Sequence, residues 1–133
     1  MRFFDTHAHL NDESFDTDRA ALIEGLPSCG AELIMDVACA AEDFEKTLEI
    51  TAEYPFIYGA YGIHPHYASD PGENWEARLR RALCDKKAAC LGEIGLDYHY
   101  DLSEKEDQKK LFDYQLKLAK ELGFPVSLHI REA

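Results

Sequence analysis

Short apolar runs alternate with longer amphipathic stretches along the whole chain, and this alternation restricts the fold more than any other feature. The runs are rich in β-branched and aromatic residues and nearly continuous, which is typical of parallel strands covered on both faces. Repeats of strand, helix and strand imply right-handed crossovers and therefore a parallel α/β sheet. The predicted strands lie near residues 3–4, 33–37, 56–61, 88–92 and 126–130.

The stretches between these runs carry apolar residues at helical spacing. They predict helices over residues 18–28, 42–53, 75–84 and 104–122. For the last helix, Ser103 followed by Glu106 predicts a capping box at the start, and Gly123 and Pro125 predict the end.

The formal net charge of −12 argues against a broad basic surface for nucleic acid. A phosphate ligand would therefore have to be bound in another way, for example by metal cations. The excess of acidic residues could also serve solubility alone. No run approaches the ~18 apolar residues of a membrane span. The N-terminus lacks the apolar core of a signal peptide, so we expect a cytoplasmic protein with no membrane partner.

The four cysteines are not spaced as metal-binding or redox pairs. We expect reduced, mostly buried thiols rather than a disulfide framework.

The histidines give the strongest functional signal in the sequence. Of the six, five fall at or just after the ends of predicted strands, and none lies on a predicted helix. Ligands of parallel α/β folds bind at the carboxyl ends of strands. The pattern therefore predicts a site there, built by His7, His9, His64, His66 and His129, with His99 farther along a loop.

The spacing of His7 and His9 places both imidazoles on one side of an extended segment, as a chelating pair would require. The alternative is that they are two surface histidines near the terminus. His64 and His66 could form a second metal pair, donate to a substrate anion, or belong to a structural turn.

Three further residues near the predicted strand ends carry charge. Glu93 lies between two glycines in an apolar run, where an unpaired carboxylate would be costly, so we expect a cation or hydrogen-bond donors beside it. Asp97 is interpreted as a brace of the following loop. Arg131 suits a phosphate oxygen or a simple salt bridge.

Taken together, several segments resemble the TatD family of metal-dependent deoxyribonucleases, within the amidohydrolase-like hydrolases. They are DTHAHL (5–10), GIHPH (62–66), GEIGLDY (92–98), residues 115–122 with Pro125 and Val126, and HIREA (129–133). The resemblance implies a (β/α)8 TIM-barrel fold and hydrolysis of phosphodiester bonds from a DNA end, with RNA as an alternative substrate.

The resemblance also implies a two-metal site at the carboxyl ends of the strands. His7 and His9 would bind one divalent ion, Glu93 would bridge two, and His129 would bind the second. His64 and Arg131 would face the substrate. Mg²⁺ is the expected ion, with Mn²⁺ or Zn²⁺ as alternatives, and the ions would activate a water for attack.

Eight units at the observed strand spacing would need about 250 residues. We therefore expect a barrel truncated after the fifth strand, with residues 1–133 forming an incomplete domain of strands one to five and helices one to four. A further histidine and a general-base aspartate of the family would lie beyond residue 133. We expect weak or no activity from the chain alone, and self-association through open sheet edges.

Two alternatives stay open. One is another hydrolase of the same superfamily acting on a small molecule, against which Glu93 argues because several such relatives have a carboxylated lysine at this position. The other is a non-catalytic, metal-binding half-barrel.

Overall fold

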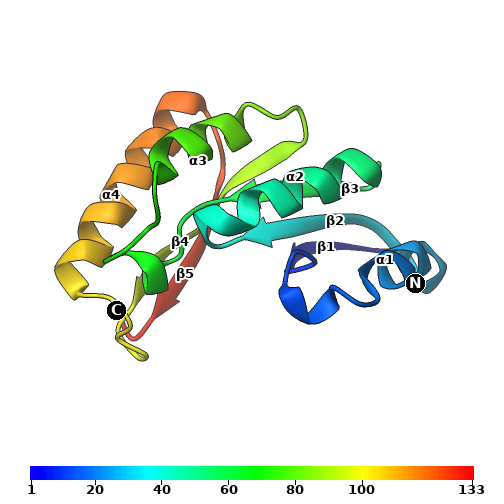
Figure 1. Ribbon diagram of the computed structural model, residues 1–133, viewed down its shortest axis with the longest axis horizontal. Helices are drawn as coiled ribbons and strands as arrows, with labels where there is room; N and C mark the ends of the chain where they lie inside the picture. The colour runs from blue at the N-terminus through cyan, green and yellow to red at the C-terminus, as the bar shows by residue number, and fades with distance from the viewer.

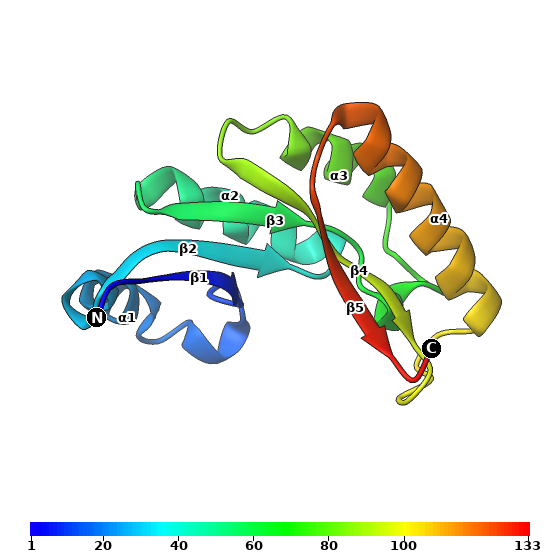
Figure 2. The ribbon, with the colours of Figure 1, turned by 180° about the vertical axis from the view of Figure 1, so that it is seen from behind.

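A computed structural model describes all 133 residues and confirms a parallel five-stranded sheet with the strands in chain order (Figures 1 and 2). Each strand pairs with the next one along the chain. The sheet is strongly curled, and β4 and β5 run steeply across the direction of β1 to β3. The strands are β1 (Phe3–Ala8), β2 (Ala31–Ala38), β3 (Ile57–Tyr61), β4 (Ala88–Asp97) and β5 (Val126–Arg131).

The four predicted helices are confirmed, each within a few residues of its expected ends. They are α1 (Arg19–Gly25), α2 (Phe44–Glu53), α3 (Trp75–Leu83) and α4 (Lys105–Leu122). Short 3₁₀ turns occur at Glu13–Phe15, Leu26–Cys29, Ala41–Asp43 and Pro65–Tyr67. None of the helices is both long and apolar enough to cross a membrane.

The helices α2, α3 and α4 cover one face of the sheet, and no helix lies on the opposite face (Figure 2), where Val37, Ala60 and Cys90 form a small buried cluster. The larger core cluster lies beneath these helices and includes Phe44, Tyr61, Leu79, Leu91 and Leu118. A second cluster around Ile23, Ile34 and Ile57 fixes α1 and α2 to β2 and β3. This packing places the loops that follow the strands at one end of the sheet.

The fourth strand is longer than predicted and includes Glu93 and Asp97. It stays paired with β5 as far as Asp97 and Arg131. The pairing is close, because a Cβ atom at Gly95 would overlap the backbone oxygen of His129. Glycine at this position therefore lets β5 approach β4, which brings His129 toward Glu93.

The predicted capping box is wrong. Helix α4 is capped by Glu104 without a side-chain hydrogen bond. The hydroxyl of Ser103 is used elsewhere, since it donates to the backbone oxygen of His66 at 2.8 Å and accepts from the amide of Ser69 at 3.2 Å. The predicted end is confirmed, because Gly123 adopts the left-handed conformation at the carboxyl end of the helix.

All four cysteines are free, as expected. The expectation that most are buried is wrong, because Cys29 and Cys84 are exposed and only Cys90 is buried. Both exposed thiols lie where the chain leaves a helix on the surface, at the end of a 3₁₀ turn and after α3.

Candidate metal centre

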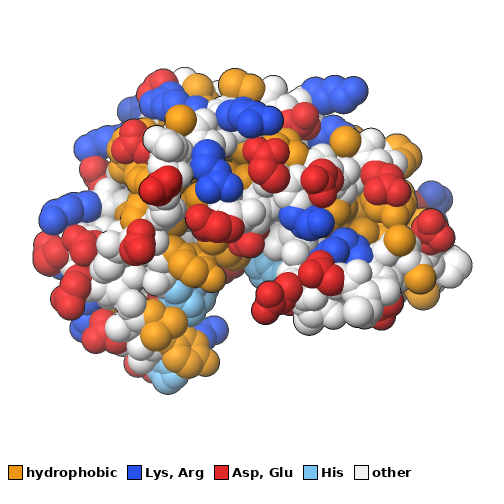
Figure 3. All heavy atoms as spheres, in the orientation of Figure 1, with side chains coloured by type: hydrophobic (Ala, Val, Ile, Leu, Met, Phe, Trp, Pro, Cys, Tyr) orange, Lys and Arg blue, Asp and Glu red, His pale blue; other side chains and the backbone are white.

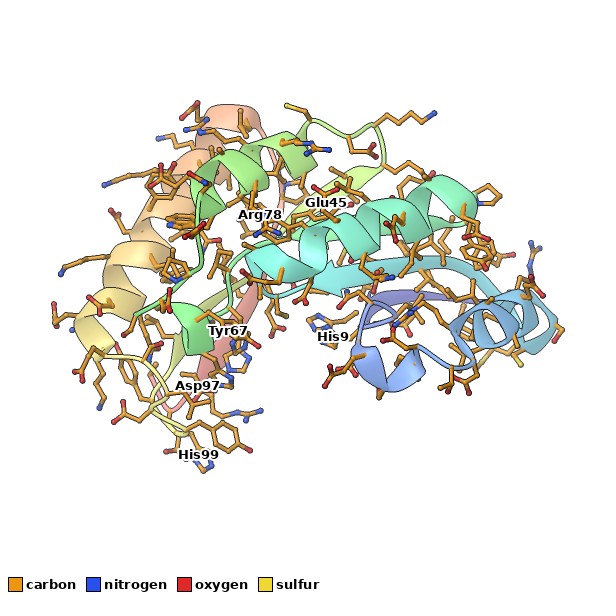
Figure 4. The ribbon with its side chains drawn as sticks, in the orientation of Figure 1. His9, Glu45, Tyr67, Arg78, Asp97 and His99 are labelled. Atoms are coloured by element: carbon orange, nitrogen blue, oxygen red, sulfur yellow. The ribbon has the colours of Figure 1, made fainter.

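Histidine side chains lie on both sides of a hollow at one edge of the molecule (Figure 3), and His9 is the histidine that lines it. Figure 4 shows the side chains of this region. His9 lies on one side of this hollow, and Tyr67 and Asp97 lie on the other. The hollow has a volume of about 460 Å³. It is lined by His9, Asn11, Asp12, Glu13, Cys39, Asp43 and Tyr67.

Glu93 lies between two histidines that come from opposite edges of the sheet. Its Oε2 atom is 3.2 Å from Nε2 of His7, on β1, and its Oε1 atom is 3.0 Å from Nδ1 of His129, on β5. Burial opposes ionisation of Glu93, but His64, His7 and His129 together hold the pKa of its carboxyl below the usual value. The two oxygens of one carboxylate thus face two separate imidazoles.

The residues His7, His9 and Glu93 form one set of converging donors, with ligand atoms within 4.8 Å of one another. His9 is oriented by the backbone, because its Nδ1 lies 2.9 Å from the oxygen of Val37. A backbone oxygen only accepts hydrogen bonds, so Nδ1 carries the proton and the lone pair of Nε2 stays free. This is the arrangement of a metal-binding histidine.

His129 is oriented in the same way by a carboxylate. Its Nε2 atom lies 2.8 Å from Oδ2 of Asp97 and its Nδ1 atom lies 3.0 Å from Oε1 of Glu93, so each ring nitrogen faces a carboxylate oxygen. With the Nε2 proton donated to Asp97, the lone pair of Nδ1 would be the one to bind a cation beside Glu93. Carboxylate, histidine and metal commonly line up in this order in protein metal sites.

The spacing of these atoms suits a divalent cation. Two ligand atoms at right angles, each about 2.1 Å from an ion, are about 3.0 Å apart. The separations from Glu93 to His7 and to His129 are 3.2 and 3.0 Å. Imidazole and carboxylate donors are compatible with Mg²⁺, Mn²⁺ and Zn²⁺, so the residues present fit a metal centre with Glu93 at its middle.

Asp97 is completely buried and accepts hydrogen bonds on both oxygens. Oδ1 accepts from the amides of His99 and Tyr100, each at 3.0 Å, which matches the predicted role as a loop brace. Oδ2 lies against both His66 and His129. Burial raises the pKa of Asp97, but the donors around it hold that pKa well below its usual range.

His64 differs from the other histidines in its hydrogen bonding. It is buried, and its Nδ1 accepts from the amide of His66 at 3.2 Å. Burial, followed by the neighbouring His66 and His129, lowers the pKa of His64 to about 4. The ring is therefore neutral near pH 7 with its proton on Nε2, which can donate a hydrogen bond. His64, His66 and His129 also form a second set of converging donors, with ligand atoms within 4.8 Å of one another.

Arg131 ends β5 on the same side of the hollow as Asp97. Its guanidinium lies 5.1 Å from the centre of the Tyr100 ring and forms no salt bridge with an acidic residue. His99 belongs to neither set of converging donors, which are His7, His9 and Glu93 and, separately, His64, His66 and His129. Its Nδ1 lies 3.0 Å from an exposed carboxylate oxygen of Glu132.

Two buried glutamines of α4 fix the backbone that carries the site. Gln115 accepts from the amide of Ile63 at 2.8 Å and donates to its oxygen at 3.0 Å. Gln108 binds the amide and the oxygen of Asp97 in the same way, at 2.8 and 3.1 Å. In the sequence, the signal for these contacts is that Gln108 and Gln115 lie on the otherwise apolar face of the helix. This signal was not used in the predictions above.

Asp36 plays a similar part beneath the loop that carries His9. This buried carboxylate accepts from the amide of Leu10 at 2.6 Å, from the side chain of Asn11 at 3.0 Å and from the hydroxyl of Thr47 at 2.9 Å. Burial raises the pKa of Asp36, although these donors oppose the effect. The sequence analysis did not identify Asp36, Asn11 or the contact between His66 and Asp97.

Comparison with known proteins shows which family the chain resembles. A family profile described as "TatD related DNase" matches residues 4–133. The uncharacterized metal-dependent hydrolase YabD of Bacillus subtilis is 42% identical over 130 residues, which cover 98% of this chain and 51% of that protein. The 3'-5' ssDNA/RNA exonuclease TatD of Cronobacter sakazakii is 32% identical, with coverage of 98% and 49%.

Solved structures agree on the fold. The TatD homologue YJJV from Escherichia coli matches with a TM-score of 0.89 and 36% identity, over 98% of this chain and 51% of that one. A TatD-family hydrolase from Entamoeba histolytica, at 23% identity and a TM-score of 0.88, supports the fold alone. The (β/α)8-type fold is thus confirmed, and the chain spans about half the length of the relatives it matches.

Proposed function

Because this chain belongs to the TatD related DNase family, we propose that its residues supply part of a two-metal site that hydrolyses phosphodiester bonds at the end of a DNA or RNA strand. The observation that carries the proposal is the position of Glu93, whose two oxygens face His7 and His129 separately. The printed name of the Cronobacter relative, a 3'-5' ssDNA/RNA exonuclease, supports the substrate class.

The ligand assignment follows from the free lone pairs. His7 and His9 would hold one ion together with Oε2 of Glu93, while His129 and Oε1 of Glu93 would hold the other. Mg²⁺ is the proposed ion, with Mn²⁺ or Zn²⁺ as alternatives. When bound, such ions neutralise charge on the phosphate and lower the pKa of a coordinated water.

The remaining residues orient the substrate. His64 presents a neutral Nε2–H, which would donate a hydrogen bond to a phosphate or sugar oxygen without adding charge. Arg131 has a guanidinium free of salt bridges that would contact a phosphate oxygen. Asp97 and the oxygen of Val37 accept from Nε2 of His129 and from Nδ1 of His9, which would leave the other nitrogen of each ring to a metal ion.

The proposed site would also need one more histidine and a water-activating aspartate, which residues 1–133 do not supply at the positions described above. We therefore expect the 133-residue chain, assayed alone, to bind metal but to cleave DNA weakly or not at all. Its edge strands β1 and β5 also present exposed apolar side chains, and we propose that the isolated chain self-associates through them.

Metal titration by calorimetry, paired with cleavage of an end-labelled single-stranded oligonucleotide, tests the proposal. His9→Ala should weaken Mn²⁺ binding by at least about tenfold, because it removes a ligand outright. His99→Ala is the matched control, since this histidine lies outside the donor sets, and should leave binding unchanged.

Equal Mn²⁺ affinity in wild type and His9→Ala would contradict the ligand assignment. Cleavage that needs no divalent ion would contradict the catalytic proposal. Metal binding with no cleavage in any longer form of the protein would favour a non-catalytic metal-binding role.

A further inference from the structure

The two sides of the hollow differ in charge. The side formed after β1 presents Asp12 and Glu13, and Asp43 lines the same cavity. Figure 3 shows acidic side chains along this rim and histidines on both sides of the hollow. An anionic strand is repelled from the acidic side, so a nucleic acid that reaches Glu93 would lie toward the opposite side.

The opposite side presents an exposed aromatic ring. Tyr100 is 54% exposed. Arg131 lies 5.1 Å from its ring centre. The imidazoles of His66 and His99 approach it edge-on at centroid distances of 5.7 and 4.7 Å.

The backbone that carries this ring is tied to the metal centre. The amide of Tyr100 donates to Oδ1 of Asp97 at 3.0 Å, and the amide of His99 donates to the same oxygen. The other oxygen of Asp97 binds His66 and His129. One buried carboxylate thus links the backbone of Tyr100 to a proposed metal ligand.

The charge around the ring is favourable for a nucleotide. Arg131 forms no salt bridge with an acidic residue, and its N–H groups stay available while its plane lies near Tyr100. Of the acidic residues on this side, Glu132 is paired with His99 at 3.0 Å, and the exposed Asp101 directly follows Tyr100. A base on the ring would therefore lie beside the guanidinium of Arg131 and the paired carboxylate of Glu132.

We propose that Tyr100, with Arg131 beside it, stacks against the nucleobase of the nucleotide whose phosphate is bound at Glu93. The proposal rests on the proposed function. It adds a contact to the nucleobase, which the metal centre itself does not bind. Stacking tolerates any base, because every base has a π-face, so this subsite would favour nucleic acid over other phosphodiesters without sequence preference.

Fluorescence anisotropy of the 133-residue chain with Mn²⁺ tests the subsite with two labelled probes. One is a short single-stranded oligonucleotide, and the other is the same strand with abasic residues at its 3′ end. Tyr100→Ala should weaken binding of the normal strand about 5- to 100-fold, the range expected for one lost stacking contact. Tyr100→Phe should retain the affinity, and the abasic strand should bind weakly and be insensitive to both changes.

Tyr58→Ala is the matched control. Tyr58 also has a cation over its ring, Lys87 at 5.3 Å, but it lies near the start of β3 at the other end of the sheet. This variant should leave both affinities unchanged, and circular dichroism should show that every variant keeps its fold.

The outcomes separate the two proposals. Equal affinity for both probes, unaffected by Tyr100→Ala but still lost without Mn²⁺ or in His9→Ala, would overturn the stacking subsite and leave the metal centre intact. Binding of neither probe in the presence of Mn²⁺ would overturn both proposals.

Discussion

Asp97 determines which ring nitrogens of His66 and His129 remain available. Its Oδ2 lies 2.9 and 2.8 Å from their Nε2 atoms, so both imidazoles direct Nε2 toward the carboxylate and Nδ1 away from it. In Asp97→Asn the amide can offer only one acceptor oxygen, and its N–H₂ group would meet an imidazole N–H. We expect Mn²⁺ affinity to fall about 10- to 100-fold, measured by calorimetry.

The control for this change is Asp107→Asn. Asp107 accepts a surface hydrogen bond from Ser69 and lies outside the donor sets, so its loss should leave Mn²⁺ affinity unaltered. If Asp97→Asn keeps both its fold and the wild-type affinity, the orientation of His129 does not depend on this carboxylate.

At the residue scale, the sequence predicted the gathering of the histidines better than their partners. His7, Glu93 and His129 could be expected near one another because each lies near a strand end, and parallel strands bring these ends together. The double role of Asp97 could not be predicted. It depends on the register of β4 against β5, in which Asp97 pairs with Arg131, and nothing in a single sequence fixes that register.

Helix α4 acts as a support for two strand ends, through Gln115 at Ile63 and Gln108 at Asp97. In Gln115→Leu the buried amide and oxygen of Ile63 would both lose their partner. Each unsatisfied group costs about 1–3 kcal/mol, so we expect the free energy of unfolding to fall by about 2–4 kcal/mol in urea denaturation. The metal centre should weaken as well, because Ile63 precedes His64.

Leu116→Ala provides the comparison on the same helix. Leu116 is on the partly exposed face of α4, and its truncation should cost less than about 1 kcal/mol. A loss for Gln115→Leu as small as that of Leu116→Ala would mean that the clamp on Ile63 does not stabilise the fold.

At the element scale, short apolar runs predicted all five strands and apolar residues at helical spacing predicted all four α-helices, because burial against the rest of the core sets both patterns. The ends of the helices and strands were harder to predict. Ser103 has the sequence of a capping residue, but its hydroxyl binds the backbone of His66 and Ser69, and Glu104 begins the helix. A long-range contact of this kind overrides a local signal, which is why the capping box was wrong.

The whole molecule is a curled sheet with helices on one side and two unpaired edge strands. Phe4 on β1 is 55% exposed and Leu128 on β5 is 53% exposed, in contrast to the buried strands between them. Open edges with apolar side chains readily pair with further strands. We expect the sedimentation coefficient of the 133-residue chain to rise with concentration in analytical ultracentrifugation.

Lysine on an edge strand opposes such pairing, since burying its charge is costly. The double change Phe4→Lys and Leu128→Lys should therefore hold the chain as a monomer at concentrations where wild type associates. Leu102→Lys alters an equally exposed leucine outside the sheet and should leave association intact. Association that persists in the edge variant would place the contact on another surface, whereas a wild type that stays monomeric throughout would show that the curl of the sheet protects its own edges.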